Sequence, residues 1–184
     1  MKKGFKTWCE NKSVEIRQGL GIHAHGPLPY DVLAQHMRIP ICSADGLPLP
    51  RAVKHQLFVS DKRSWSALSV PIEDSHVVLF NPTTTSARRT SSIMHELAHV
   101  IRDHKTTKFY TLRGTDLRIR NFDPEQEEEA DWLGGCLLLP RTALLHALRK
   151  RLPNTEIQAI YGVSAELLRM RINKTGVKKQ LGIK

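Results

Sequence analysis

Cysteine is scarce in this sequence, and the few thiols present do not form a disulfide framework. Three cysteines, Cys9, Cys42 and Cys136, are spread over 184 residues, and no two of them form a Cys-x-x-Cys pair. An odd number of scattered thiols is typical of proteins that fold in a reducing compartment. The pattern excludes the small disulfide-stapled class of secreted proteins and predicts a cytoplasmic location.

Long hydrophobic runs are also missing. The most apolar stretch is WLGGCLLLP at residues 132–140, well short of the ~20 residues that a membrane-spanning helix needs. The N-terminal stretch MKKGFKTWCENK is basic, but no apolar run follows it, so it lacks the pattern of a secretory signal. With 40% hydrophobic residues, the composition is that of an ordinary soluble globular domain, and it predicts no membrane partner.

Acidic residues are outnumbered by basic ones. The chain has 28 Lys and Arg against 18 Asp and Glu, which gives a formal net charge of +10. An excess of this size is compatible with attraction to nucleic acid or to an acidic protein partner, but it identifies neither.

The apolar pattern predicts a mixed chain dominated by helices. Apolar residues recur at helical intervals in 5–20, and the segment 30–38 follows the breaker run GPLP, so both predict helices. Prolines punctuate residues 40–75 and predict turns and short strands, while HVVLFN at 76–81 predicts a strand. Residues 105–122 predict strand or loop, and the part after Arg141 predicts further helices.

The stretch TSSIMHELAHVIRDH at residues 90–104 carries two histidines with metal-ligand spacing on a helix with one apolar stripe. His95 and His99 are one helical turn apart, so their imidazoles can bind one zinc ion. Glu96 lies about 100° round the helix from His95 and can act as general base on a zinc-activated water. The ordinary alternative is that the HExxH pattern arose by chance, which would happen in roughly 2% of such chains.

A catalytic zinc needs a third protein ligand, and the acidic run that opens the next predicted helix, around residues 124–139, can supply it. Acidic residues at a helix start also have an ordinary explanation, because they favour the helix dipole while staying solvated. Glu127 and Asp131 nevertheless share the face that small residues make suitable for close packing. We expect Glu127 to bind the ion, with Glu128 as the alternative, and Asp131 to accept a hydrogen bond from a ligand histidine.

HELAH followed downstream by EEEADWLGGCLLLP resembles the ImmA/IrrE family of zinc metallopeptidases, whose members show an HExxH helix and then E-x-E-A-[ND]-x-F-A-A-x-L-L-x-P. Two positions depart from that pattern: Leu133-Gly134-Gly135 replaces the usual FAA step, and Asp131 replaces the commoner Asn. The resemblance implies an α+β fold, mainly helical and of the gluzincin type, with a small β-sheet. We expect a metallopeptidase domain over 1–150 with its core at about 76–140, and a helix-turn-helix-like segment over 151–184 packed on it.

The resemblance also implies the chemistry and the partner. A zinc-dependent metalloendopeptidase would hydrolyse a peptide bond in a helix-turn-helix transcriptional repressor, in the setting of a phage or another mobile element. An oxyanion stabiliser is expected as well. The candidates are His104, Tyr110 and Arg113, although each of them is more readily explained as an ordinary surface or structural residue. If the strand at 76–81 is an edge strand, an extended substrate segment can add to it.

The C-terminal stretch TEIQAIYGVSAELLRMRIN supports a rival function. It has the shape of a helix-turn-helix whose second helix carries Arg169, Arg171 and Asn173. The rival is a DNA-associated regulator or sensor with a structural or signalling zinc and no proteolysis. Direct DNA binding is the less favoured reading, because such helical hairpins are also plain packing units. Glu96 separates the two functions, since a structural zinc site has no use for it.

Overall fold

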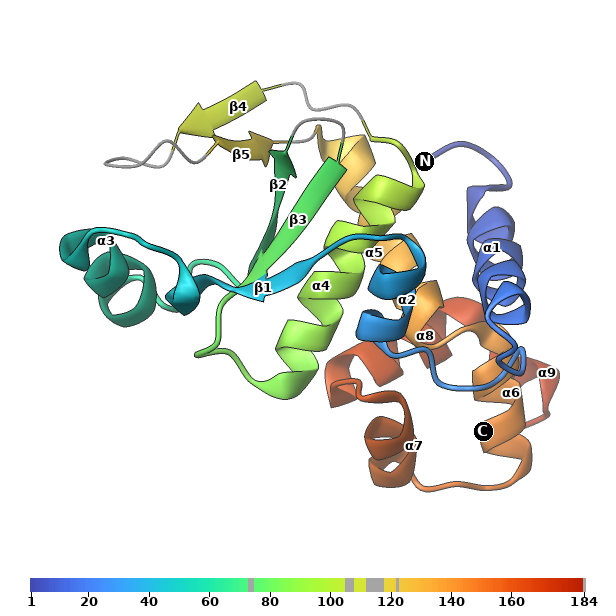
Figure 1. The fold of residues 1–184 in the computed structure, drawn as a ribbon. Helices are drawn as coiled ribbons and strands as arrows, with labels where there is room; N and C mark the ends of the chain where they lie inside the picture. The colour runs from blue at the N-terminus through green and yellow to red at the C-terminus, as the bar shows by residue number, and fades with distance from the viewer. Residues whose placement is uncertain (73–74, 105–107, 112–117, 122, 184) are drawn as a thin grey trace.

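The computed structural model describes residues 1–72, 75–104 and 123–183, together with the backbone of residues 108–111 and 118–121 (Figure 1). The helices within these ranges are α1 (Phe5–Gly19), α2 (Tyr30–His36), α3 (Arg51–His55), α4 (Ser86–Ile101), α5 (Pro124–Leu138), α6 (Arg141–Arg149), α7 (Asn154–Tyr161), α8 (Ala165–Thr175) and α9 (Val177–Gln180), with short helical turns η1 (Ala44–Gly46) and η2 (Gln56–Ser60). The strands are β1 (Ile41–Ser43), β2 (Ala67–Ile72), β3 (Ser75–Phe80), β4 (Lys108–Thr111) and β5 (Arg118–Asn121).

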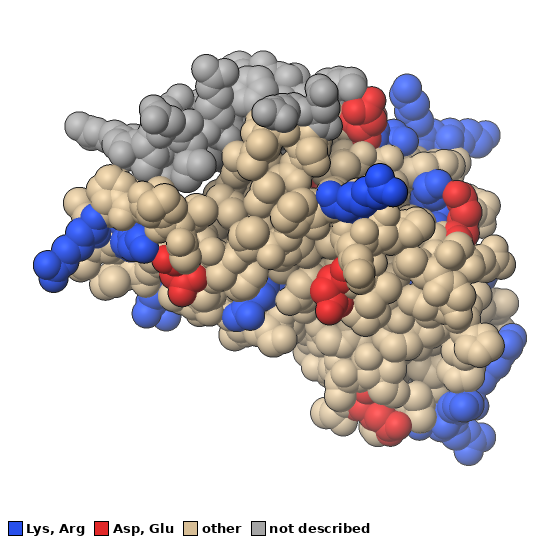
Figure 2. Space-filling view, in the orientation of Figure 1, with Lys and Arg blue, Asp and Glu red and all other residues tan. Residues whose placement is uncertain are grey.

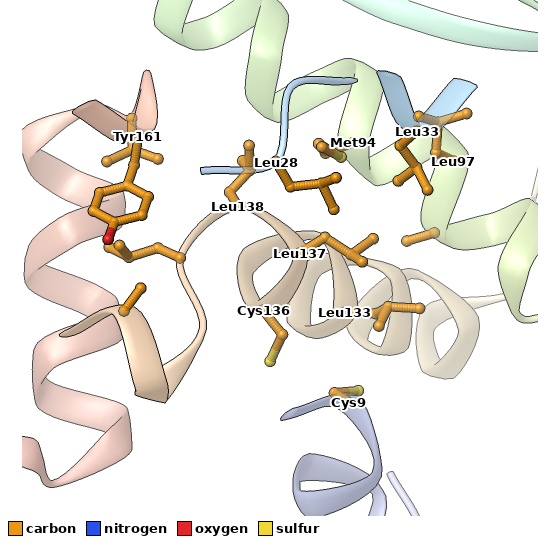
Figure 3. Packing of buried hydrophobic residues seen from close by; sticks show 14 of the residues in the cluster. Cys9, Leu28, Leu33, Met94, Leu97, Leu133, Cys136, Leu137, Leu138 and Tyr161 are labelled. Carbon is orange, nitrogen blue, oxygen red and sulfur yellow. The ribbon is translucent and has the colours of Figure 1, made fainter. Parts of the chain in front are cut away.

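The elements form layers with α4 at the centre. The sheet packs on one side of α4, α5 packs on another, and α1 covers α5, while α6 to α9 gather at one end (Figure 1). One apolar cluster joins α4, α5 and the C-terminal helices, and Figure 3 shows Leu97 of α4, Leu133 of α5 and Tyr161 of α7 within it. The predicted fold class, mainly helical α+β with a small sheet, is therefore confirmed. No helix in the described ranges is long and apolar enough to cross a membrane.

The predicted strand at 76–81 exists as β3, but it does not lie at a sheet edge, so the condition for adding a substrate segment to it is not met. The strand order is β1-β3-β2, so β3 is the central strand. It pairs in parallel with β1 and antiparallel with β2, and Val78 and Leu79 are buried on its two faces. A short apolar run buried on both faces is typical of a central strand. In this sheet the edges are β1 and β2, and Pro71 in β2 is tolerated there.

Residues 44–60 differ from the predicted turns and strands, because part of the segment is helical. η1, α3 and η2 occupy most of it. Pro50 does not break α3, because it stands at the N-cap position, outside the region where a missing backbone N–H would cost a helical hydrogen bond. The prolines therefore mark the start of a helix here as well as turns.

α4 and α5 pack antiparallel at short range. Asp123 caps α5 by accepting a hydrogen bond from the Gln126 backbone N–H at 2.9 Å, and Pro124 occupies the first helical turn. Gly134 faces α4 so closely that a Cβ atom there would lie 3.4 Å from the Cα atom of His95. The small side of α5 thus brings the motif helix next to the acidic helix.

Two buried arginines hold the C-terminal end of α5, where backbone carbonyls lack partners within the helix. Arg17 of α1 donates from Nη2 to the Leu137 carbonyl at 2.6 Å, and Arg171 of α8 donates from Nε to the Leu139 carbonyl at 2.9 Å. Arg171 also pairs with Glu10. Burial lowers the pKa of Arg17 to about 10, so this guanidinium stays charged at neutral pH. Arginine is suited to this role because its fork reaches several acceptors at once.

Replacing Arg171 with methionine should lower the free energy of unfolding by about 1.5–3 kcal/mol, because a buried carbonyl and Glu10 lose a charged donor. Arg169 lies on the same helix but is exposed, so Arg169→Met should change the free energy of unfolding by less than about 0.5 kcal/mol. Urea denaturation of the two variants measures both values. Equal effects would contradict the assigned role of Arg171.

Candidate metal centre

The motif helix α4 and the acidic helix α5 bring three metal-ligating groups together. His95 and His99 come from adjacent turns of α4, and Glu127 comes from the first turns of α5. One ligand atom from each residue lies within 4.8 Å of the other two, and among the described residues this is the group that could hold a metal ion. His99 is buried, whereas the side chains of His95 and Glu127 are 22% and 45% exposed. The cluster therefore opens to solvent on one side.

The spacing of these atoms fits a tetrahedral ion. The Nε2 atoms of His95 and His99 are 3.0 Å apart. Glu127 places Oε2 3.2 Å from His95 Nε2 and Oε1 3.6 Å from His99 Nε2. Ligand atoms bound at ~2.0–2.1 Å to a tetrahedral zinc lie about 3.3 Å from one another. The residues present thus fit a divalent ion in both chemistry and distance.

Asp131 orients the first histidine. Its Oδ1 lies 2.8 Å from His95 Nδ1, so Nε2 is turned towards Glu127 and His99. Burial alone would lower the pKa of His95, but the hydrogen bonds to Asp131 and Glu127 and the charge of Glu96 outweigh it and raise the pKa to about 10. The metal-free imidazole therefore holds a second proton at neutral pH, and a bound ion would take its place.

The second histidine is oriented from the interior. His99 Nδ1 lies 2.9 Å from Nδ1 of His104, and His104 Nε2 lies 3.2 Å from the Glu129 carboxylate. Burial lowers the pKa of His104. Burial of Glu129 acts to raise its pKa, but the hydrogen bonds from Arg102 and His104 lower it below its usual range. Arg102 donates to Glu129 Oε2 from both Nε and Nη2, at 3.0 and 2.7 Å.

A polar groove of ≈ 400 Å³ reaches the open side of the cluster. It runs between the start of β2 and the first half of α4, and its lining includes Trp65, Ala67, Arg88, His95 and Glu96. Glu96 is half-buried and lines this groove next to His95, a member of the candidate metal cluster. A carboxylate in that position can reach a small molecule held between the ion and the groove.

The remaining predicted residues fall in different places. Glu128 is exposed and lies 3.6 Å from the N-terminal ammonium group, so Glu127 is the member of the acidic run that joins the histidines. His104 lies behind His99, because His99 turns Nδ1 towards it and Nε2 towards His95. Tyr110 belongs to β4, but its side chain lies outside the described residues, as does the whole of Arg113.

Sequence reasoning missed the contact between His104 and Glu129. Both residues were noted in the motifs, yet nothing in the spacing of one helix indicates which residue of another helix its side chain will meet. The antiparallel packing of α4 on α5 decides that pairing, and Arg102 then joins it from the end of α4.

Comparison with known proteins identifies a family and proteins of similar structure. Residues 52–173 match the sequence profile of the peptidase M78 family, described as the IrrE N-terminal-like domain. A Mycobacterium tuberculosis transcriptional regulator has a similar structure, with a TM-score of 0.56 and 18% sequence identity over 89% of this chain and 46% of that chain. The chain thus spans less than half of that regulator, and the likeness shows a shared fold alone. No curated protein matches the sequence.

Removing the Glu127 carboxylate should weaken metal binding strongly, because two histidines alone leave the ion without its anionic ligand. Glu127→Ala should raise the zinc dissociation constant by at least about 100-fold, and Glu128→Ala should leave it within about threefold of wild type. Competition with a chromophoric chelator measures both constants. If the two alanine variants bound zinc equally well, the assignment of Glu127 would be wrong.

Proposed function

The chain belongs to the peptidase M78 family, and from that premise we propose that it is a zinc-dependent endopeptidase acting on a protein partner. The observation that carries the proposal is the His95–His99–Glu127 cluster, whose ligand atoms lie within 4.8 Å of one another. Glu96 beside it lines a groove that a polypeptide segment can enter. The candidate ligands, the candidate base and an opening to solvent therefore lie together where α4 packs on α5.

The two histidines and Glu127 would hold the ion through Nε2, Nε2 and a carboxylate oxygen. When bound, zinc polarises a scissile carbonyl and lowers the pKa of water towards neutrality. Three protein ligands leave one tetrahedral position for reactants, which is the arrangement of catalytic rather than structural zinc sites. The partial exposure of His95 and Glu127 is consistent with such an open position.

Glu96 supplies the proton transfers. Its carboxylate would accept a proton from the attacking water and pass it to the leaving amine, which separates the two halves of the cleaved chain. The residue is not needed as a ligand, because His95, His99 and Glu127 would supply the three protein ligands of a catalytic zinc. A scissile bond lying in the groove between β2 and α4 would be close to this carboxylate.

We infer that the substrate is a helix-turn-helix transcriptional repressor. The resemblance of the HELAH and EEEAD segments to ImmA/IrrE metallopeptidases supports this substrate class, as does the net charge of +10, which favours an acidic partner or one already bound to DNA. A cytoplasmic location follows from the same inference, because such repressors act there.

The rival function is a DNA-associated regulator or sensor with a structural or signalling zinc site and no proteolysis. The net charge and the α7–α8 hairpin favour it. Arg171, however, is 1% exposed and holds the end of α5, so it does not face DNA. On the face drawn in Figure 2, lysines and arginines are scattered rather than gathered in one stripe. The peptidase is therefore the better-supported function.

Glu96→Gln should abolish cleavage while the zinc stays bound, because an amide cannot accept the proton. We expect kcat to fall by about 10²–10⁴-fold when the variant is incubated with a helix-turn-helix repressor that the wild-type chain cleaves. Glu166→Gln, an exposed change on α8, is the matched control and should cleave like wild type. Zinc content by mass spectrometry and cleavage by gel analysis measure the two properties.

Two results would count against this mechanism. Cleavage by zinc-loaded Glu96→Gln at the wild-type rate would remove Glu96 from the mechanism. Tight, sequence-specific DNA binding by a zinc-loaded wild-type chain that cuts no repressor would favour the rival function.

A further inference from the structure

The two histidine ligands differ in what contacts the ring nitrogen facing away from the ion. His95 Nδ1 meets a carboxylate, Asp131, at an exposed position. His99 Nδ1 meets a second imidazole, His104, and both of these side chains are buried. A carboxylate accepts hydrogen bonds only, whereas an imidazole either donates or accepts at each nitrogen. His104 must therefore itself be held in one tautomer if it is to hold His99 in one.

The contacts behind His104 provide that control. Its Nε2 lies 3.2 Å from Oε2 of Glu129, which is 6% exposed and also accepts two hydrogen bonds from Arg102. The Arg102 guanidinium lies 5.0 Å from the ring centre of Phe5 and 4.8 Å from that of Trp8, so α1 holds it in place. The contacts therefore run from the candidate metal ligand His99 through Glu129 of α5 to α1.

A bound ion would fix which nitrogen of His99 and of His104 carries the proton. A neutral imidazole that binds an ion through Nε2 carries its proton on Nδ1, so His99 donates and His104 Nδ1 accepts. The proton of neutral His104 then lies on Nε2 and is donated to Glu129, which has only acceptors. Each contact from His99 through His104 and Glu129 to Arg102 then joins a donor to an acceptor.

We propose that His104, supported by Glu129 and Arg102, is a positioning residue that keeps His99 in the tautomer and ring orientation required for binding the ion. The proposal rests on the metal-binding part of the proposed function, and it does not depend on whether the chain cuts a repressor. It gives His104 a task different from the oxyanion contact considered from the sequence. The task acts through His99 and needs no contact with the substrate.

The alternative, that these residues merely fill space, leaves their polarity unexplained. Neighbouring buried positions on the same helices are apolar, such as Leu97, Ala98 and Ala130. A buried carboxylate costs free energy unless it is paired and hydrogen-bonded. A buried chain of hydrogen bonds is expected where the direction of the bonds matters. Here the chain ends at His99, whose ring must present Nε2 to the ion.

The test compares two replacements of His104 in the full chain. Leucine has a similar size but no acceptor, whereas glutamine offers an oxygen to His99 and an amide donor to Glu129. His104→Leu should raise the zinc dissociation constant by about 10–100-fold, and His104→Gln should bring it back to within about threefold of wild type. His36→Leu, which replaces an exposed histidine on α2, is the control and should bind zinc like wild type.

The melting temperature of the metal-free proteins separates positioning from simple packing. Leu and Gln variants that melt together but differ in zinc affinity support the proposal. Unchanged zinc affinity in His104→Leu overturns it, and so does an equal loss of affinity and melting temperature in both variants. A wild-type chain that binds zinc but cleaves no repressor would count against the peptidase alone, while the affinities of the two variants still decide the role of His104.

Discussion

The close antiparallel packing of α4 on α5 is the contact on which the site depends. His95 and His99 follow from the sequence of one helix, but Glu127 joins them only because the other helix lies at this distance and in this register. Gly134 leaves room for the approach, since a Cβ atom there would already lie in contact with the backbone of α4, 3.4 Å from the Cα atom of His95. Arg17 and Arg171 fix the far end of α5, so the register of the two helices is held at both the site and the opposite end.

This packing also determines which groups orient the two histidines. The ligand histidines are oriented from two sides, by an exposed carboxylate on His95 and by a buried chain of contacts on His99. A site held in this way is rigid on its interior side and open towards the groove, where Glu96 lies. In the proposed enzyme such an arrangement would leave substrate access on one face while the metal ligands stay fixed from the other.

The sequence predicted those parts of the site that depend on a single helix. The one-turn spacing of His95 and His99 needs no tertiary information, and the choice of Glu127 followed from the face it shares with small residues. The central place of β3 was not predicted, because it depends on pairing with β1, a strand of three residues too short to recognise. The partners of His104 were missed for a similar reason, since they come from across a helix interface.

The central claim is that His95, His99 and Glu127 bind one divalent ion together, and anomalous X-ray scattering from a zinc-loaded crystal tests it most directly. The account predicts a zinc peak within about 2.0–2.2 Å of both Nε2 atoms and of a Glu127 carboxylate oxygen. A peak located away from these atoms, or zinc bound by the histidines without Glu127, would contradict it.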